Sequence, residues 1–202
     1  GTSIPAIRAL VGHPFEVIIK NTLVFGDIPL RVDALSAWFI LIINLTMLTG
    51  GFYGIDYMKA YRDQKANLSL HWILLVIFHL SMLSVCMIQN GLLFLITWEV
   101  MSLSSMLLVI FEHYKPETLR AGLNYLVQMH LSVVLLTLGV AGLYLRTHSF
   151  DFSSAMQLDA AAILPLFVLF FLGFAFKAGF MLGFIPLHTW LPHAHPAAPS
   201  HI

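Results

Sequence analysis

Residues 91–111 read GLLFLITWEVMSLSSMLLVIF, an apolar stretch with a single acidic residue, Glu99, near its middle. The stretch is long enough to cross roughly 30 Å of hydrocarbon, which takes about 20 helical residues. Because lipid offers no hydrogen-bond partners to an open backbone, a helix is the expected structure. The segment therefore predicts a transmembrane helix that carries a charge.

Four further stretches have similar length and character. Together they predict five membrane spans, near residues 35–55, 70–89, 91–111, 122–145 and 160–186. Turn-forming residues separate neighbouring spans, such as Asn90-Gly91 and Lys115-Pro116-Glu117. We predict an all-α integral membrane protein with its transmembrane bundle in residues 34–202. The Pro-rich residues 186–202 predict a break that makes the last helix discontinuous.

The composition agrees with a membrane protein. Hydrophobic residues make up 59% of the 202 residues and charged residues 10%, against about 25% charged in soluble domains. These values exclude a soluble globular domain, a disordered chain and a basic nucleic-acid-binding protein. One cysteine, Cys86, gives neither a disulfide framework nor a cysteine-based metal site. We interpret the chain as an internal part of a longer membrane protein.

The first 33 residues differ from the rest, and we expect them to lie outside the membrane. Residues 21–33 read NTLVFGDIPLRVD, in which two short apolar runs flank Gly26-Asp27. This pattern favours a β-hairpin at the membrane surface, with Pro29 restricting the second run to an edge strand.

The charged loops predict the orientation of the chain. The loops at 56–69 and 112–121 carry most of the basic residues near the spans: Lys59, Arg62, Lys65, Lys115 and Arg120. The loops of the opposite side contribute only Arg146. The positive-inside rule places the two basic loops in the cytoplasm. We expect a bacterial or archaeal cytoplasmic membrane.

Two charges fall inside predicted spans: Glu99 in the third and Lys177 in the fifth. A charged residue at the centre of a membrane helix costs about 2.5–3.5 kcal/mol on insertion scales, so such residues usually face a protein interior and serve a function. Burial raises the pKa of an acid and lowers that of a base, whereas pairing opposes both shifts. We expect Glu99 and Lys177 to form a pair that exchanges protons when its partners move apart.

Polar residues accompany these charges at helical spacing. Ser102 and Ser105 share a face with Glu99, and Gln128 belongs to a polar stripe with Asn124 and Ser132 in the fourth span. His130 lies beside that stripe. These groups predict a route for protons between the two charges.

Two structural alternatives stay open. Glu99 and Lys177 are equally compatible with a static ion pair that joins two helices, and His130 with a hydrogen bond between helices. The histidines near the end of the chain match no zinc-binding spacing and prolines interrupt them, so we expect no metal site. Those histidines are His188, His193, His195 and His201.

Several motifs resemble the antiporter-like proton-pumping subunits of respiratory complex I, Mrp antiporters and energy-converting hydrogenases. They are TWEVMSLSS at 97–105, FKAG at 176–179, PLHTWLP at 186–192 and VDALS at 32–36. YLVQMH at 125–130 and AHPAAPSH at 194–201 most resemble the formate-hydrogenlyase and hydrogenase branch. The motifs follow one another in the family's order over residues 21–202.

The resemblance implies about fourteen helices in two inverted repeats, of which this chain provides most of one. It implies that Glu99 and Lys177 transfer protons, and we expect a relay through His130, His188 and His195. It also implies other membrane subunits, a soluble redox arm, and no cofactor in this chain. Eight residues separate Lys177 from Pro186, about one helical turn more than the family pattern, which changes the setting of Lys177.

We therefore predict an ion-translocating subunit of a redox-driven complex, without redox chemistry of its own. One alternative is a subunit of an Mrp-type sodium/proton antiporter. Another is a membrane scaffold that transports nothing and keeps a static ion pair.

Overall fold

The computed structural model describes residues 2–22, 26–178 and 190–201. Five helices are long and apolar enough to span a membrane, which confirms the five predicted spans. They are α2 (Ala34–Tyr57), α3 (Lys65–Val85), α4 (Gly91–Val109), α5 (Pro116–Thr147) and α6 (Ala160–Ala178).

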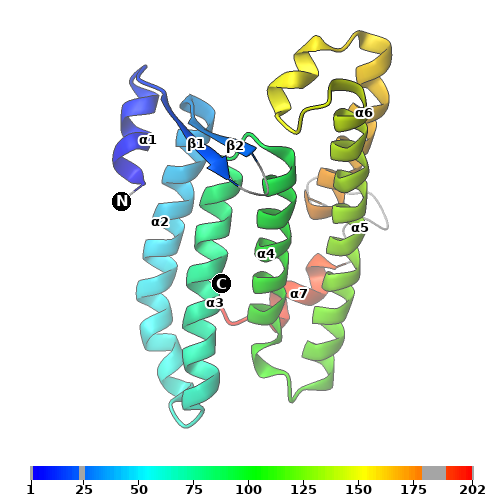
Figure 1. Cartoon of the computed structure of the whole chain (residues 1–202). Helices are drawn as coiled ribbons and strands as arrows, with labels where there is room; N and C mark the ends of the chain where they lie inside the picture. Colours follow the sequence, from blue (N-terminus) through cyan, green and yellow to red (C-terminus); the bar gives the residue numbers. More distant parts are fainter. Residues whose placement is uncertain (1, 23–25, 179–189, 202) are drawn as a thin grey trace.

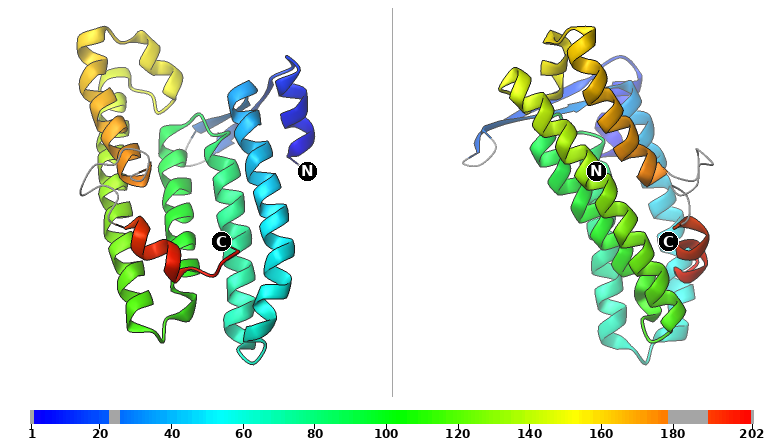
Figure 2. Two further views of the ribbon diagram at one scale, coloured as in Figure 1. Left: turned by 180° about the vertical axis from the view of Figure 1, so that it is seen from behind. Right: turned by 90° about the vertical axis from the view of Figure 1, so that its right-hand side faces the viewer.

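The spans stand side by side in chain order from α2 to α5, and α6 packs along the upper part of α5 (Figure 1). The short helices η1 (Met58–Tyr61) and η2 (Ile110–Glu112) lie at the end that carries the two basic loops. At the opposite end lie the N-terminal strands and η3 (Phe152–Gln157). The last helix, α7 (Leu191–Ala197), lies across the bundle on the face turned toward the viewer in the left view of Figure 2. From there the chain runs from α5 toward α3.

Helices α3 and α5 differ in their bounds from the sequence prediction. α3 ends at Val85 rather than near residue 89, because the chain after it bonds to the N-terminal sheet: the Gln89 amide donates to the Pro29 carbonyl (3.1 Å), and the Arg31 amide to the Met87 carbonyl (2.9 Å). α5 runs from Pro116 to Thr147, well beyond the predicted 122–145, since its polar ends continue the helix outside the apolar run.

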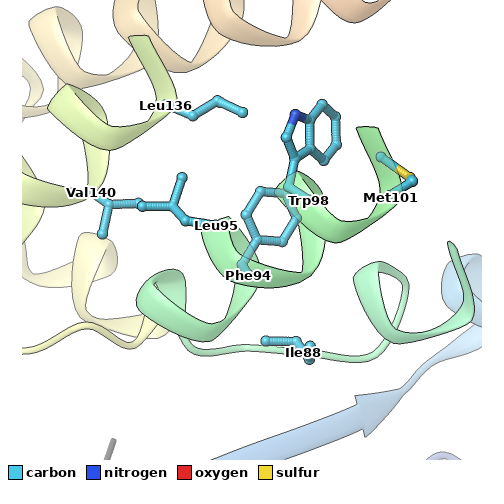
Figure 3. Packing of buried hydrophobic residues seen from close by; sticks show 7 residues of the cluster. All are labelled: Ile88, Phe94, Leu95, Trp98, Met101, Leu136 and Val140. Carbon is cyan, nitrogen blue, oxygen red and sulfur yellow. The ribbon is translucent and has the colours of Figure 1, made fainter. Parts of the chain in front are cut away.

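The central core joins α4 to α5. Phe94, Leu95 and Trp98 of α4 point toward Leu136 and Val140 of α5 (Figure 3). Close packing of such large side chains holds the two helices together, and dispersion contacts supply the attraction that the hydrophobic effect cannot give between lipid-exposed helices. The polar site described below lies next to this core.

Small residues let α6 approach α5 closely. A Cβ at Gly173 would lie 2.8 Å from two side-chain carbons of Leu136, and a Cβ at Gly139 would meet the ring of Phe170 at 3.1 Å. The Ser132 hydroxyl, fully buried, donates to the Gly173 carbonyl at 2.6 Å. This contact fixes α6 one helical turn before Lys177.

The N-terminal region forms helix α1 (Ser3–Leu10) and an antiparallel pair of strands, β1 (Phe15–Thr22) and β2 (Gly26–Val32). The predicted turn at Gly26-Asp27 is wrong, because both residues belong to β2. The Asn44 amide of α2 donates to the hydroxyls of Thr2 and Ser3 at 3.0 Å. Helix α1 therefore lies alongside the first span.

The end of the fifth span and the expected helix break fall mostly on residues 179–189, which lie outside the described residues. On either side of them, α6 ends at Ala178 and α7 begins at Leu191. Helix α7 contains Pro192 near its start and Pro196 inside it.

Candidate functional site

Lys177 lies in the last turn of α6 and reaches between α4 and α5. Its Nζ donates to the hydroxyls of Ser102 (3.2 Å) and Tyr125 (3.0 Å). It also lies 5.8 Å from the ring centre of Trp98 and 5.4 Å from that of Tyr125, within the range of cation–π attraction. Two hydroxyls and two aromatic faces thus replace part of the water that an ammonium group loses in a membrane.

The direction of the hydrogen bonds favours a charged Lys177. The Ser102 hydroxyl donates to the Trp98 carbonyl (3.0 Å), and the Ser105 hydroxyl to the Ser102 carbonyl (2.9 Å). Ser105 therefore accepts from the Tyr125 hydroxyl, 2.5 Å away. Because Ser102 and Tyr125 already use their protons elsewhere, both oxygens are left to accept from an ammonium group, which is a pure donor.

Glu99 has a different partner, His130 of α5. The Glu99 Oε1 lies 3.1 Å from Nε2 of His130, and the other ring nitrogen, Nδ1, lies 3.0 Å from the Leu126 carbonyl. A carbonyl only accepts, so Nδ1 carries a proton. The single proton between Nε2 and Oε1 then belongs either to an imidazolium beside a carboxylate or to a carboxylic acid beside a neutral ring.

The predicted direct pair of Glu99 with Lys177 is wrong for this structure. Among the described residues, the ion pairs within 4 Å include Glu99 with His130 and none between Glu99 and Lys177. The two side chains leave α4 and α6 toward different partners: Lys177 toward the buried hydroxyls of Ser102 and Tyr125, Glu99 toward the half-exposed His130. The acid and the base therefore flank α5 as two separate groups.

The carboxylate of Glu99 is incompletely compensated. Its second oxygen, Oε2, is buried and has no hydrogen-bond partner among the described residues. A buried polar atom without a hydrogen bond is costly, so this oxygen is open to a donor that approaches it.

The structure brings only some of the other predicted site residues to this region. Ser102, Ser105 and His130 take part as described, and Gln128 lies buried on α5 one turn after Tyr125. His195 is exposed on α7. His188 lies outside the described residues.

Two aromatic residues at the site were not predicted. Tyr125 supplies the central hydroxyl, and Trp190 packs edge-on against its ring at 5.0 Å between centres. The Trp190 indole donates to the Phe176 carbonyl at 3.2 Å, which ties α7 to the turn of Lys177. Tyr125 falls in the polar stripe one residue after Asn124 and three before Gln128, and that spacing was the available signal.

A polar cleft of about 760 Å³ opens at the end of the basic loops. It lies between η2, the first turns of α5, and α7. Its lining includes Glu112, Lys115, Glu117, Arg120, Asn124 and His193. Asn124, which lines the cleft, directly precedes Tyr125 in α5. Among the described residues, no three His, Cys, Asp or Glu side chains lie close enough together to hold a metal ion.

The chain is similar to proteins of membrane complexes. It is 37% identical to hydrogenase-4 component B of Escherichia coli over 179 residues, which cover 88% of this chain and 26% of that protein. It is 30% identical to the putative antiporter subunit mnhA2 of Staphylococcus aureus over 180 residues, 86% of this chain and 21% of that protein. The chain thus spans about a quarter of the length of these relatives.

A solved structure shares the fold. A chain of the membrane-bound sulfane sulfur reductase, an archaeal respiratory membrane complex, matches 99% of this chain and 40% of its own length, with a TM-score of 0.79 and 19% identity. Residues 89–202 match the family model described as NADH:quinone oxidoreductase/Mrp antiporter, transmembrane. That match covers more than half of the sequence and includes Glu99, His130 and Lys177, so the chain is an integral membrane protein that belongs to this antiporter-like family.

Proposed function

We propose that the chain translocates protons as part of an antiporter-like subunit in a redox-driven membrane complex. One observation carries the proposal: an acid that shares a proton with an imidazole, Glu99–His130, and an ammonium group whose partners among the described residues are neutral, Lys177, flank the same helix. Each group has a proton to exchange, and neither is locked in a direct ion pair with the other.

The two groups are coupled through charge. A shift of the Lys177 ammonium toward Glu99 stabilises the carboxylate and drives the shared proton onto His130. A neutral Lys177, or one drawn away, lets the proton return to Glu99. Lys177 receives and releases protons through Tyr125 and Ser105, with the polar cleft as the approach from the side of the basic loops. We place that side in the cytoplasm of a bacterial or archaeal cell.

The relatives support this setting. Their names denote a hydrogenase component, a putative antiporter subunit and a respiratory membrane complex. We infer that other membrane subunits and a soluble redox arm accompany the full-length subunit and supply the driving force. No redox cofactor is assigned to this chain, whose part is the movement of ions.

The test uses the intact complex in proteoliposomes. Glu99→Gln and Lys177→Met are each expected to abolish proton uptake while the complex still assembles, because Gln cannot release a proton and Met cannot carry one. Matched controls are Glu16→Gln and Lys59→Met, which remove the same charges at exposed sites away from the cleft. Unchanged uptake in either buried variant would overturn the mechanism.

The similarity to mnhA2 favours a second candidate, sodium/proton antiport. The same proteoliposomes distinguish it, since proton movement would then require sodium and respond to a sodium gradient. The third candidate is a static membrane scaffold, which predicts a different result. Replacing both charges, as Glu99→Leu with Lys177→Leu, would then leave proton transport normal.

A further inference from the structure

A second pair of ionisable side chains lies away from Lys177. His71 of α3 and His201, which follows α7, approach each other with their Nε2 atoms 2.8 Å apart. His71 is 1% exposed. The pair joins α3 to the stretch of chain beyond α7, which runs toward α3 in Figure 2.

The surroundings are shaped for His201. A Cβ at Gly54 of α2 would lie 2.6 Å from Cδ2 of His201, and one at Gly50 would lie 3.0 Å from its carbonyl oxygen. A Cβ at Gly51, between them, would meet nothing within 4 Å. Gly50 and Gly54 of α2 therefore leave the space that His201 occupies.

Aromatic rings complete the enclosure. Phe111 lies 5.0 Å from the ring of His71, and Tyr57 lies 5.5 Å from the ring of His201. Trp72 lies next to both histidines. The histidines thus occupy an aromatic pocket between α2, α3 and η2.

The proton count of this pair follows from its geometry. Two facing Nε2 atoms form one hydrogen bond only if one ring donates and the other accepts. The donating ring then has a bare lone pair on Nδ1, and the Nδ1 atoms of both rings are buried without a hydrogen-bond partner among the described residues. A proton added at that lone pair turns the donor into an imidazolium and strengthens the bond, whereas a further proton would place two N–H groups face to face.

The charged groups nearest to the two histidines are separated from them by aromatic side chains. From η1, Tyr61 packs edge-on against Phe111 at 5.1 Å, and its hydroxyl donates to Glu112 of η2 at 3.1 Å. Glu112 in turn accepts from Lys115. Tyr57 of α2 and Trp72 of α3 also contact the pair. Among the described side chains, no carboxylate or ammonium group lies within ion-pairing distance of either imidazole, so an added proton is shared within the pair.

Helix α7 connects this pair to the Lys177 site. At its start, Trp190 contacts Tyr125 and donates to the Phe176 carbonyl. Just beyond its end, His201 bonds to His71. The segment from Trp190 to His201 therefore contacts both sites.

We propose that His71 and His201 form a second proton-binding site, which takes up one proton as an imidazolium–imidazole pair and in that state clamps α7 in place beside Tyr125 and Lys177. The proton-binding step stands alone, while its effect on transport rests on the proposed function. Loss of the proton weakens the clamp and loosens the packing of Trp190 on Tyr125.

The first test observes the pair directly, in the assembled complex with ¹⁵N-labelled histidine. Solid-state NMR is expected to show two Nε2 atoms coupled through one hydrogen bond and the uptake of a single proton as the pH falls. His71→Gln removes the coupling and changes the titration of the remaining His201, while the control His79→Gln, two turns further along the same helix, keeps both signals as in the wild type. Two uncoupled histidines in the wild type would overturn the proposal.

The second test measures proton transport against pH. His71→Gln keeps a side chain able to hydrogen-bond His201 but leaves a single imidazole in place of the pair, so we expect the pH dependence of transport to shift. Gly54→Ala displaces His201 and lowers transport, whereas Gly51→Ala, with open space around it, leaves transport unchanged. Equal transport in the two alanine variants contradicts the clamp.

The two proposals fail in different ways. If the wild-type complex moves no protons while the NMR coupling and titration are present, the proposed function fails and the proton-binding pair stands. If protons move, Glu99→Gln stops them, and His71→Gln changes neither the NMR titration nor the transport profile, the pair is only a structural contact and this inference is wrong.

Discussion

The hydroxyl of Tyr125 connects Lys177 of α6 to Ser105 of α4. It accepts from Lys177 at 3.0 Å and donates to Ser105 at 2.5 Å. Its ring also contacts Trp190 of α7. Tyr125 therefore positions the ammonium group through its hydroxyl and contacts Trp190, at the start of α7, through its ring.

Tyr125→Phe is expected to slow proton transport without preventing assembly, because Phe keeps the packing and removes only the oxygen. A hydrogen bond to a charged group contributes about 1.5–3 kcal/mol, so we expect a loss of about tenfold or more in the rate of proton uptake. Tyr144→Phe, a partly exposed tyrosine further along α5 that stacks on Phe150, serves as the control. Equal rates in both variants would remove Tyr125 from the mechanism.

Single residues also mark the limit of prediction from the sequence. Glu99 and Lys177 stand out because a charge in an apolar span is rare, and the structure places both next to polar partners. Their partners were not predictable, because the direction of a side chain depends on how α4, α5 and α6 rotate against one another. Tyr125 escaped notice since an aromatic residue in a membrane span has the same sequence signature as a packing residue.

At the scale of elements, helix caps and glycine contacts fix where the spans begin and how closely they approach. Asp33 is the N-cap of α2 and accepts from the Ser36 amide at 2.9 Å. That hydrogen bond, with help from Arg31, lowers the pKa of the Asp33 carboxyl below its ordinary 3.8. A lowered pKa in the folded state means that the carboxylate stabilises the fold above pH 3.8 and that this stability is lost as the pH falls through the folded-state pKa.

Asp33→Ala is accordingly expected to lower the free energy of unfolding by about 1 kcal/mol at neutral pH. The difference from wild type should shrink below pH 3.8, where the wild-type cap becomes protonated. Thermal unfolding in detergent at several pH values measures both effects. Asp33→Asn, which keeps an acceptor oxygen and cannot titrate, should retain most of the stability at neutral pH; a loss as large as that of Asp33→Ala would show that the cap is not the cause.

Gly173→Ala tests the contact between α5 and α6. The new methyl group would lie 2.8 Å from Leu136 and 3.2 Å from the Ser132 carbonyl oxygen, so the helices must separate or repack. Overpacking of this kind costs about 1–3 kcal/mol, and we expect a lower melting temperature together with slower transport, since Lys177 follows one turn later. Gly51→Ala is again the matched control, and equal melting temperatures would contradict the close contact.

Elements also show why hydropathy locates spans better than it locates their ends. The apolar runs of all five spans were visible, but α3 ends where residues 87–89 bond to β2, a contact between distant parts of the chain. The helix α1 depends in the same way on packing of Ala6 and Ala9 against Ala37 and Ile40 of α2. Such elements are decided by tertiary contacts, which a single sequence does not display.

At the scale of the whole molecule, the bundle has two unlike ends. The basic loops, η1, η2 and the polar cleft lie at one end, and the β-strands with η3 lie at the other (Figure 1). In the proposed mechanism, the polar approach to Lys177 therefore opens at the end that carries the two basic loops. The direction of proton uptake depends on which compartment that side faces.

We expect the end with the basic loops to face the cytoplasm, and cysteine labelling in whole cells measures this. With Cys86→Ser as background in the full-length subunit, Arg62→Cys reports on the α2–α3 loop and Met156→Cys, at an 83% exposed residue of η3, reports on the opposite end. A membrane-impermeant maleimide should modify Met156→Cys in intact cells, and Arg62→Cys only after the membrane is opened. The reverse pattern would place the cleft outside the cell, and Lys177 would then release protons through it rather than take them up.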